Sequence, residues 1–177
     1  MLLQKIKNLI WWFKYRTTEK YHIVKTGLKP GYYDTDHVML HACFNLLKGF
    51  VEVEISHMYL VLSFKGKVPR WKWQYKKFIK EHQREFIIKY LDYWLDEKHW
   101  KDASEEEMQK YIQRDQEIKE LYLWWVDERP ARLARLEKEW SNPHHTSKQL
   151  VELDQAGTKE DEEMLIRLMK IRSALWT

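Results

Sequence analysis

The stretch that decides the fold spans residues 35–63 and reads TDHVMLHACFNLLKGFVEVEISHMYLVLS. Its apolar side chains recur every three or four residues, which is the period of an α-helix with one buried face. One stripe of this helix would carry Leu40, Cys43, Leu47, Phe50, Val51, Glu54, Met58 and Val61. The sequence therefore predicts a long helix over residues 35–63, with the carboxylate of Glu54 inside its apolar stripe.

The segments before this helix predict an amphipathic start and a loop. Residues 1–16 have the pattern of an amphipathic segment, and residues 21–26 are β-prone and end beside Gly27, which predicts a short extended segment. Asp34 or Thr35 can cap the open N–H groups of the first helical turn, so the long helix should begin there.

Two further helices follow the same apolar period. Pro69 suits the entry to a second helix, which should reach about Trp100 with a break or bend in the region 92–98. Ser104 and Glu107 have the spacing of a capping box, in which each side chain bonds the backbone N–H of the other residue. They predict the start of a third helix that extends to about residue 128.

The C-terminal part predicts a stop, a loop and a last helix. Pro130 should stop or kink the third helix. Residues 141–157 contain many turn-forming side chains, which predicts a flexible loop. The last helix should run from Thr158 to about Trp176, with Thr158 as its cap and Asp161 in its acidic first turn.

Composition bounds the fold class. The chain has 177 residues and a single cysteine, Cys43, so one helical domain over residues 1–177 needs no disulfide framework. We expect a mainly α bundle of about four to six helices, with the short extended segment near residues 21–26. Charged residues interrupt the longest apolar run, so a membrane-spanning helix is not expected. The 31 basic residues nearly balance the 27 acidic ones, and this mild excess does not indicate a nucleic-acid partner.

Three acidic or imidazole side chains suggest a metal site. Glu54 and His57 have the Glu-x-x-His spacing that places both groups on one helix face, as in carboxylate-bridged di-metal bundles. Asp115 lies on the apolar stripe predicted for the third helix. These groups could hold a divalent metal, including Mg²⁺ in an all-α nucleotide hydrolase. The alternative is that the carboxylates pair with cationic or hydroxyl side chains in the core, with no cofactor.

A polar ligand pocket is the second candidate site. The loop before the long helix offers a lysine, two tyrosine rings and two carboxylates, and two histidines follow one helical turn apart. A nucleotide could stack on a tyrosine, while cations meet its phosphates and carboxylates meet its hydroxyl or amino groups. The alternative is a rigid, capped turn with two aromatic anchors. The candidate ligand residues are Lys29, Tyr32, Tyr33, Asp34, Asp36, His37, His41, Arg70 and Trp71.

The ten tryptophans include pairs that predict an interface. Adjacent residues on a helix point about 100° apart, so both members of a pair should not face one core direction. We therefore expect one of each pair to be exposed or to mediate self-association into a homo-oligomer; a wide core or a ligand cleft is the alternative. The candidate interface residues are Trp11, Trp12, Trp73, Trp124 and Trp125.

Several segments give the chain a resemblance to a family of small uncharacterised proteins of tailed bacteriophages. They are LKPGYYDTD at residues 28–36, MLHACF at 39–44, FVE at 50–52, LYLWW at 121–125, EDEEMLIRLMKIR at 160–172 and the C-terminal LWT. The resemblance supplies an origin and no site residues.

Phage origin implies either a virion component or a protein that acts on host defence in the host cytoplasm. The expected function is a counter-defence protein that binds and sequesters a nucleotide-type signalling molecule without turnover. A metal-dependent nucleotide hydrolase, or a structural protein that binds a host defence protein and no small ligand, is the alternative.

Overall fold

The computed structural model describes residues 24–55, 72–142 and 145–175, and for residues 53–55 and 72–81 it describes the backbone alone. The amphipathic segment 1–16 and residues 56–63 of the long helix lie outside the described residues. So do residues 21–23, which are half of the expected extended segment 21–26; residues 24–26 have no regular secondary structure.

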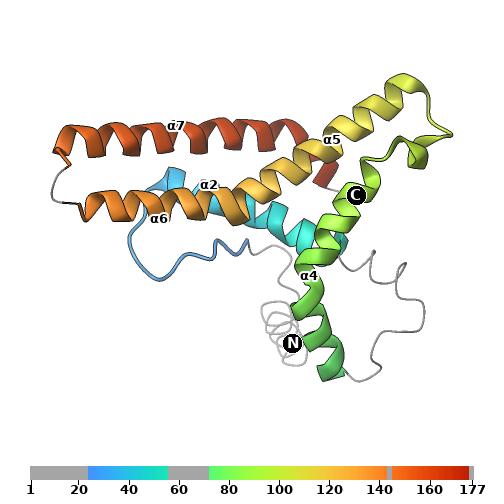
Figure 1. Ribbon diagram of the computed structural model, residues 1–177, viewed down its shortest axis with the longest axis horizontal. Coiled ribbons are helices and arrows are strands. Elements are labelled where there is room, and N and C mark those ends of the chain that lie inside the picture. The colour runs from blue at the N-terminus through green and yellow to red at the C-terminus, as the bar shows by residue number, and fades with distance from the viewer. Residues whose placement is uncertain (1–23, 56–71, 143–144, 176–177) are drawn as a thin grey trace, which may run out of the picture.

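The described chain is helical and contains no strand, so the prediction of a mainly α bundle is confirmed. Figure 1 shows the order of its elements along the chain. The α-helices are α2 (Thr35–Gly49), α4 (Lys72–Trp94), α5 (Glu105–Leu123), α6 (Arg129–Trp140) and α7 (Ser147–Ile171). Short π- or 3₁₀-helical turns extend or join them: η1 (Phe50–Ile55), η2 (Glu97–Trp100), η3 (Trp124–Glu128) and η4 (Arg172–Leu175).

The helices pack around a central rod. Helix α5, the turn η3 and helix α6 form one continuous rod that bends between α5 and α6, and α7 returns beside α6 and α5 in the opposite direction (Figure 1). Helix α2 packs against α7 and α5, while α4 crosses α5 and contacts η1. The start of α2 therefore lies close to the α6–α7 hairpin.

The buried stripe of α2 explains this packing. Leu40, Phe44, Leu47 and Val51 recur at intervals of four, three and four residues, and each is at most 5% exposed. The ring of Phe44 lies 4.9 Å from that of Trp125, centroid to centroid. Burying a large apolar side chain contributes about 1.5–3 kcal/mol, so this stripe holds α2 on the rod. The prediction that Leu40, Leu47 and Val51 lie on the buried face of this helix is confirmed, and Phe44 lies on the same face.

Two predicted boundaries are confirmed. Helix α4 ends at Trp94, and the indole Nε1 of Trp100 donates to the carbonyl of Trp94 at 2.9 Å, which closes the bend before α5. The capping box is present: the Glu107 N–H donates to Ser104 Oγ at 3.3 Å, and the Ser104 N–H donates to Glu107 Oε2 at 3.2 Å. Both ends follow from side chains that satisfy open backbone groups.

Pro130 does not stop the third helix, but the other predicted outcome, a kink, agrees with the bend between α5 and α6 at the π-helical turn η3 (Figure 1). The chain stays helical through η3 and continues as α6, in which Pro130 occupies the first turn. The Arg129 N–H donates to the carbonyl of Trp124, five residues earlier, so the hydrogen-bond ladder is already offset to a π-helical pattern. Because the regular hydrogen bonds between residues four apart are already interrupted before Pro130, the missing N–H of this proline breaks no further regular bond.

The predicted flexible loop over residues 141–157 is wrong for most of its length. Helix α7 begins at Ser147, because Thr146 and Gln149 form a second capping box. Thr158 is no cap: its hydroxyl donates to the carbonyl of Asp154 at 3.1 Å inside the helix. Asp161 consequently lies in the middle of α7 and not in its first turn.

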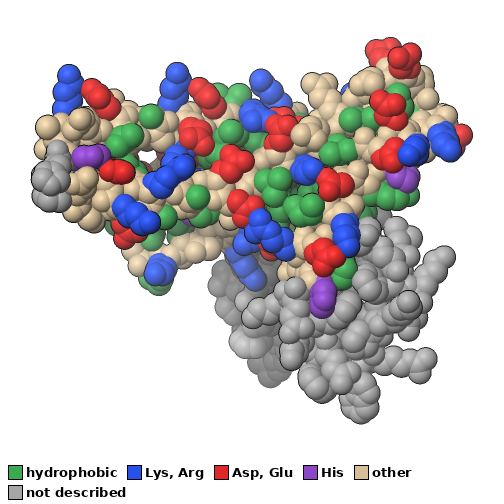
Figure 2. All heavy atoms as spheres, in the orientation of Figure 1, with side chains coloured by type: hydrophobic (Ala, Val, Ile, Leu, Met, Phe, Trp, Pro, Cys, Tyr) green, Lys and Arg blue, Asp and Glu red, His purple; other side chains and the backbone are tan. Residues whose placement is uncertain are grey.

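The outer edge of α7 is a solvated, mixed-charge face. Figure 2 shows basic and acidic side chains spaced along this edge. Lys148 pairs with Glu152, and Lys159 pairs with Glu163, each at 3.9 Å and one helical turn apart. Exposed pairs of this kind contribute about 0.3–0.5 kcal/mol each. None of the described helices is long and apolar enough to cross a membrane.

Candidate functional site

A groove lies between the start of α2, helix α6 and the middle of α7. It consists of two adjoining hollows, one of about 500 Å³ between α2 and α7 and one of about 740 Å³ between α6 and α7. His37, Thr158 and Asp161 line both hollows, which makes the groove continuous. We call it the α2–α6–α7 groove. Its size suits a small-molecule ligand.

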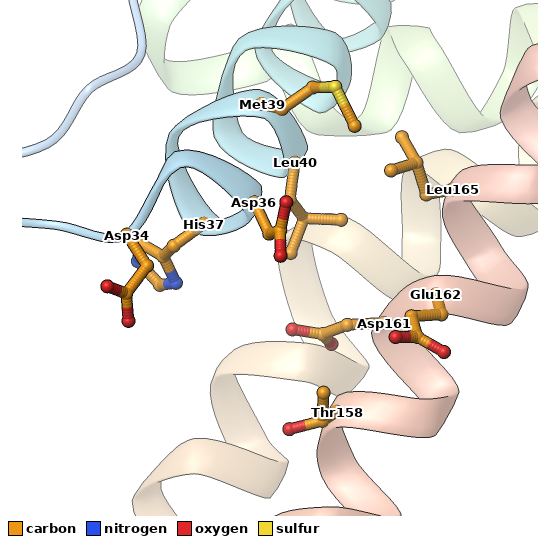
Figure 3. A pocket seen from close by; sticks show the side chains of 9 residues that line it. All are labelled: Asp34, Asp36, His37, Met39, Leu40, Thr158, Asp161, Glu162 and Leu165. Carbon is orange, nitrogen blue, oxygen red and sulfur yellow. The ribbon is translucent and has the colours of Figure 1, made fainter.

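One face of α7 forms a wall of this groove. Thr158, Asp161, Glu162 and Leu165 recur at intervals of three, one and three residues, which places them on one side of the helix. Figure 3 shows these side chains beside those of the first turns of α2. The mid-helix position of Asp161, which the sequence did not predict, is what brings its carboxylate into the groove.

Two arginines of α6 reach Asp161 and Glu160. Arg129 is 5% exposed, and its Nη2 lies 2.8 Å from Oδ2 of Asp161, with Nε 3.1 Å from both carboxylate oxygens. Arg132 pairs with Asp161 as well, and its Nη1 lies 2.8 Å from Oε2 of Glu160. A buried guanidinium is tolerated only when it is paired, so these contacts fix α6 on α7.

A column of rings connects the loop before α2 to Arg129. The ring of Tyr33 stacks on that of His37 at 5.5 Å, and His37 lies 4.6 Å from His41, centroid to centroid. His41 meets Trp125 edge to face at 4.9 Å, and the guanidinium of Arg129 lies 5.0 Å from the Trp125 ring. These five residues form the ring column, which backs the groove with aromatic surface.

The loop before α2 orients His41. Nδ1 of His41 lies 3.3 Å from the carbonyl oxygen of Thr26, which also accepts a hydrogen bond from the side-chain amide of Asn45. Gly27 has a φ of 70°, a conformation that favours glycine, and it turns the loop at this anchor. Burial and the nearby charge of Arg129 lower the pKa of His41 below its usual value, which favours the uncharged ring.

Trp124 binds the second carboxylate of α7. Its indole Nε1 donates to Oε1 of Glu160 at 2.6 Å, and the guanidinium of Arg132 lies 5.9 Å from its ring. Burial alone would raise the pKa of Glu160, but the hydrogen bond from Trp124 and the pair with Arg132 more than offset it. The pKa of Glu160 therefore lies below its usual value, and this group stays ionised.

The groove has an acidic end at α2, whereas its α6–α7 end is mixed in charge, because three arginines and four carboxylates line it. At the α2 end, Asp34, Asp36 and Glu162 form no ion pair with any described residue. At the α6 end, Arg135 is exposed and likewise has no ion-pair partner in the described chain. His145 lines the same hollow; its Nε2 lies 3.3 Å from Oε2 of Glu139, and its Nδ1 is buried with no hydrogen-bond partner among the described residues. The two ends would therefore attract different parts of one ligand.

Five of the predicted ligand residues lie together in this region. Asp34, Asp36 and His37 line the groove. Tyr33 and His41 do not line it, but both belong to the ring column behind it. The predicted loop and helix start thus meet a partner surface on α6 and α7.

The remaining predicted ligand residues do not join this group. Lys29 and Tyr32 are exposed and line neither hollow, and Tyr32 is 94% exposed. Arg70 and Trp71 lie outside the described residues.

The structure places only Asp115 of the candidate metal ligands. Asp115 is 9% exposed, and Nε of the neighbouring Arg114 donates to its Oδ1 at 2.8 Å. Burial raises the pKa of Asp115, while the Arg114 charge opposes that rise. This carboxylate therefore has a cationic partner, while a metal held by Glu54, His57 and Asp115 stays a prediction. The side chain of Glu54 and all of His57 lie outside the described residues. Among the side chains that the structure describes, no group of three or more histidine, cysteine, aspartate or glutamate residues could hold a metal ion.

Trp124 and Trp125 are both buried, at 2% and 8% exposure, so the expectation that one of this pair is exposed is wrong. Helix α2 and helix α7 cover two sides of the rod, and each tryptophan meets a different neighbour. Trp124 contacts Glu160 of α7, and Trp125 stacks on Phe44 of α2. Trp11 and Trp12 lie outside the described residues, as does the side chain of Trp73. Self-association stays a prediction.

Sequence reasoning missed the arginines and carboxylates that form the floor of the groove. Arg129 and Arg132 are three residues apart, and their partners Glu160 and Asp161 are adjacent, so complementary charges were visible in the sequence. They could be matched only once α6 and α7 were known to run side by side. No protein-family model, no curated protein and no solved structure matches this chain, so its function is inferred from the groove itself.

Proposed function

We propose that the chain binds a nucleotide-type small molecule in the α2–α6–α7 groove and releases it unchanged. The observation that carries this proposal is one continuous groove with unpaired carboxylates at its α2 end and, at its α6–α7 end, an arginine, Arg135, that has no ion-pair partner in the described chain. A nucleotide has the same polarity, because its phosphates are anionic while its sugar and base offer hydroxyl and amino donors.

The acidic end suits the sugar and the base. Asp34, Asp36 and Glu162 carry carboxylates, which accept hydrogen bonds from hydroxyl and amino groups. His37 lines the same hollow and is backed by the stacked ring of Tyr33, which adds aromatic surface for a base. This end would repel phosphate.

Arg135 is the group that would meet the phosphates, at the α6–α7 end of the groove, which Asp154 also lines. Arg135 has no ion-pair partner in the described chain, so its guanidinium is available for an incoming anion. Arg132 lies one turn away from Arg135 and adds positive charge, although its own partners are carboxylates.

Binding without turnover fits the state of the carboxylates in the floor. A general base works best when its pKa lies near the working pH. Glu160 has a lowered pKa and is therefore a poor proton acceptor, and the carboxylate of Asp161 is occupied by two arginines. They are suited to holding arginines in place.

The resemblance to tailed-phage proteins suggests a biological role for this binding. A phage protein that sequesters a nucleotide immune signal in the host cytoplasm would blunt host defence without any catalytic step. A protein that acts by binding its ligand one to one must bind it tightly and be abundant. The groove would provide the binding site.

The test is isothermal titration calorimetry of the full chain, at about 150 mM salt, against mononucleotides, cyclic mononucleotides and cyclic dinucleotides. Arg135→Gln should weaken binding of the best ligand at least tenfold. Arg172→Gln is the matched control, because Arg172 is also exposed and without an ion pair in the described chain but lies away from the groove. It should stay within twofold of the parent protein.

The bound ligand should be recovered intact by chromatography after prolonged incubation. Failure of the whole panel to bind would remove the proposal. Metal-dependent conversion of the ligand that is lost in Glu54→Gln would replace it with the hydrolase prediction.

A further inference from the structure

A second groove lies between α5 and the end of α7, away from the residues of the α2–α6–α7 groove. Its volume is about 590 Å³. Its charged and aromatic lining residues are Lys110, Tyr111, Arg114, Glu117, Arg167 and Lys170. We call it the α5–α7 groove.

Cations occupy both walls of this groove. Lys110 and Arg114 are one turn apart on α5, while Arg167 and Lys170 are three residues apart on α7. The lining thus holds four cationic side chains and one carboxylate, Glu117. A groove with such an excess of one sign concentrates ligands of the opposite charge.

The arginines of this groove are fixed by carboxylates. Arg167 holds Glu117 through two contacts of 2.7 Å and also reaches Glu120. Arg114 holds the buried Asp115. These pairs set the positions of the guanidinium groups and neutralise much of their charge.

The lysines, in contrast, are available. Lys110 and Lys170 are exposed, and neither forms an ion pair with any residue in the described parts of the chain. They come from opposite walls of the groove. Lysine is a compact point charge that suits phosphate oxygens without a fixed geometry.

The ring of Tyr111 is already covered. Trp100 stacks on it at 4.8 Å with an interplanar angle of 23°, and the guanidinium of Arg114 lies 5.2 Å from its centroid. With both groups already against the ring, Tyr111 has less open surface on which a base could stack. The groove therefore favours a compact anion over a stacked single-stranded nucleic acid.

We propose that the α5–α7 groove binds a small multivalent anion of the phosphate class, held between Lys110 and Lys170. Arg114 and Arg167 add positive charge from fixed positions beside them. This site shares no lining residue with the α2–α6–α7 groove, so it does not depend on the function proposed for that groove.

The test uses inorganic pyrophosphate as the probe, titrated into the full chain by calorimetry at about 150 mM salt. The double variant Lys110→Gln/Lys170→Gln should raise the dissociation constant at least tenfold. The control, Lys148→Gln/Lys159→Gln, removes the same charge from exposed lysines of α7 that line neither groove. It should stay within twofold, as should Arg135→Gln.

Circular dichroism melts of all variants verify that they fold. Equal weakening in both double variants would overturn the site, because it would reduce the effect to net charge. Weakening by Arg135→Gln alone would also overturn it, because pyrophosphate would then occupy the other groove. The absence of saturable pyrophosphate binding would also overturn the site, even if a glutamate-rich peptide bound to the protein instead.

Discussion

Arg129 and Asp161 form a bidentate ion pair beneath the α2–α6–α7 groove, although they are 32 positions apart in the chain. The pair joins α6 to α7 and aims the carboxylate of Asp161 at the groove. It also holds the guanidinium of Arg129 against the ring of Trp125, at the end of the ring column. The geometry of the candidate site thus depends on a contact that also stabilises the fold.

Asp161→Asn should lower the free energy of unfolding by about 3 kcal/mol, because it leaves the buried charge of Arg129 uncompensated. Urea denaturation measures the loss. Asp92→Asn is the matched control, since Asp92 pairs with Lys119 but its side chain is 52% exposed. That change should cost less than about 1 kcal/mol. Equal losses in the two variants would contradict the structural role of the Arg129–Asp161 pair.

Trp124→Ala should cost about 4 kcal/mol, because Trp124 is 2% exposed and its removal leaves a cavity and takes from Glu160 the hydrogen bond of the indole N–H. Trp140→Ala, at a tryptophan that is 56% exposed, should cost less than about 1 kcal/mol. Thermal melts and sedimentation analysis should be run together. A stable Trp124→Ala chain with a changed assembly mass would instead support the interface predicted from the sequence.

Thr146→Ala should destabilise the start of α7 by about 1 kcal/mol, because it removes one half of the capping box with Gln149. Hydrogen exchange should become faster over residues 147–157. Ser104→Ala removes the matching cap of α5 and should leave exchange over residues 147–157 unchanged. Fast exchange over residues 147–157 in the parent protein would restore the flexible loop predicted from the sequence.

The helices were predictable where local chemistry alone defines them. The apolar period of Leu40, Leu47 and Val51 and the capping box of Ser104 with Glu107 need no knowledge of the rest of the chain. The fate of Pro130 was not predictable in this way. It depends on the π-helical offset in η3, which spacing and composition did not reveal.

The same distinction applies to the candidate site. Asp34, Asp36 and His37 could be proposed because they lie within four residues of one another at a helix start. Arg129 and Asp161 could not, because their proximity follows from the packing of α6 against α7. The early start of α7 had to be known first, since it moves Asp161 from the first turn of a helix to its middle.

Acidification should destabilise the protein through His41. Burial, Arg129 and His37 lower the pKa of this ring in the folded state, whereas in the unfolded chain it titrates near 6.5. Below that pH the unfolded chain binds more protons than the folded one, so the free energy of unfolding falls as pH falls. At pH 7.5 and above, His41 is largely uncharged in both states and contributes no pH dependence.

His41→Gln removes the titrating group and keeps a side-chain N–H that can donate to the carbonyl of Thr26. Urea denaturation at pH 8.5, 7.5 and 5.5 should therefore show a smaller loss of stability on acidification in this variant than in the parent protein. Between pH 8.5 and 7.5 the two proteins should change in parallel. An equal loss between pH 7.5 and 5.5 would mean that His41 is not held in its uncharged form by Arg129 and burial, and that other groups set the acid response.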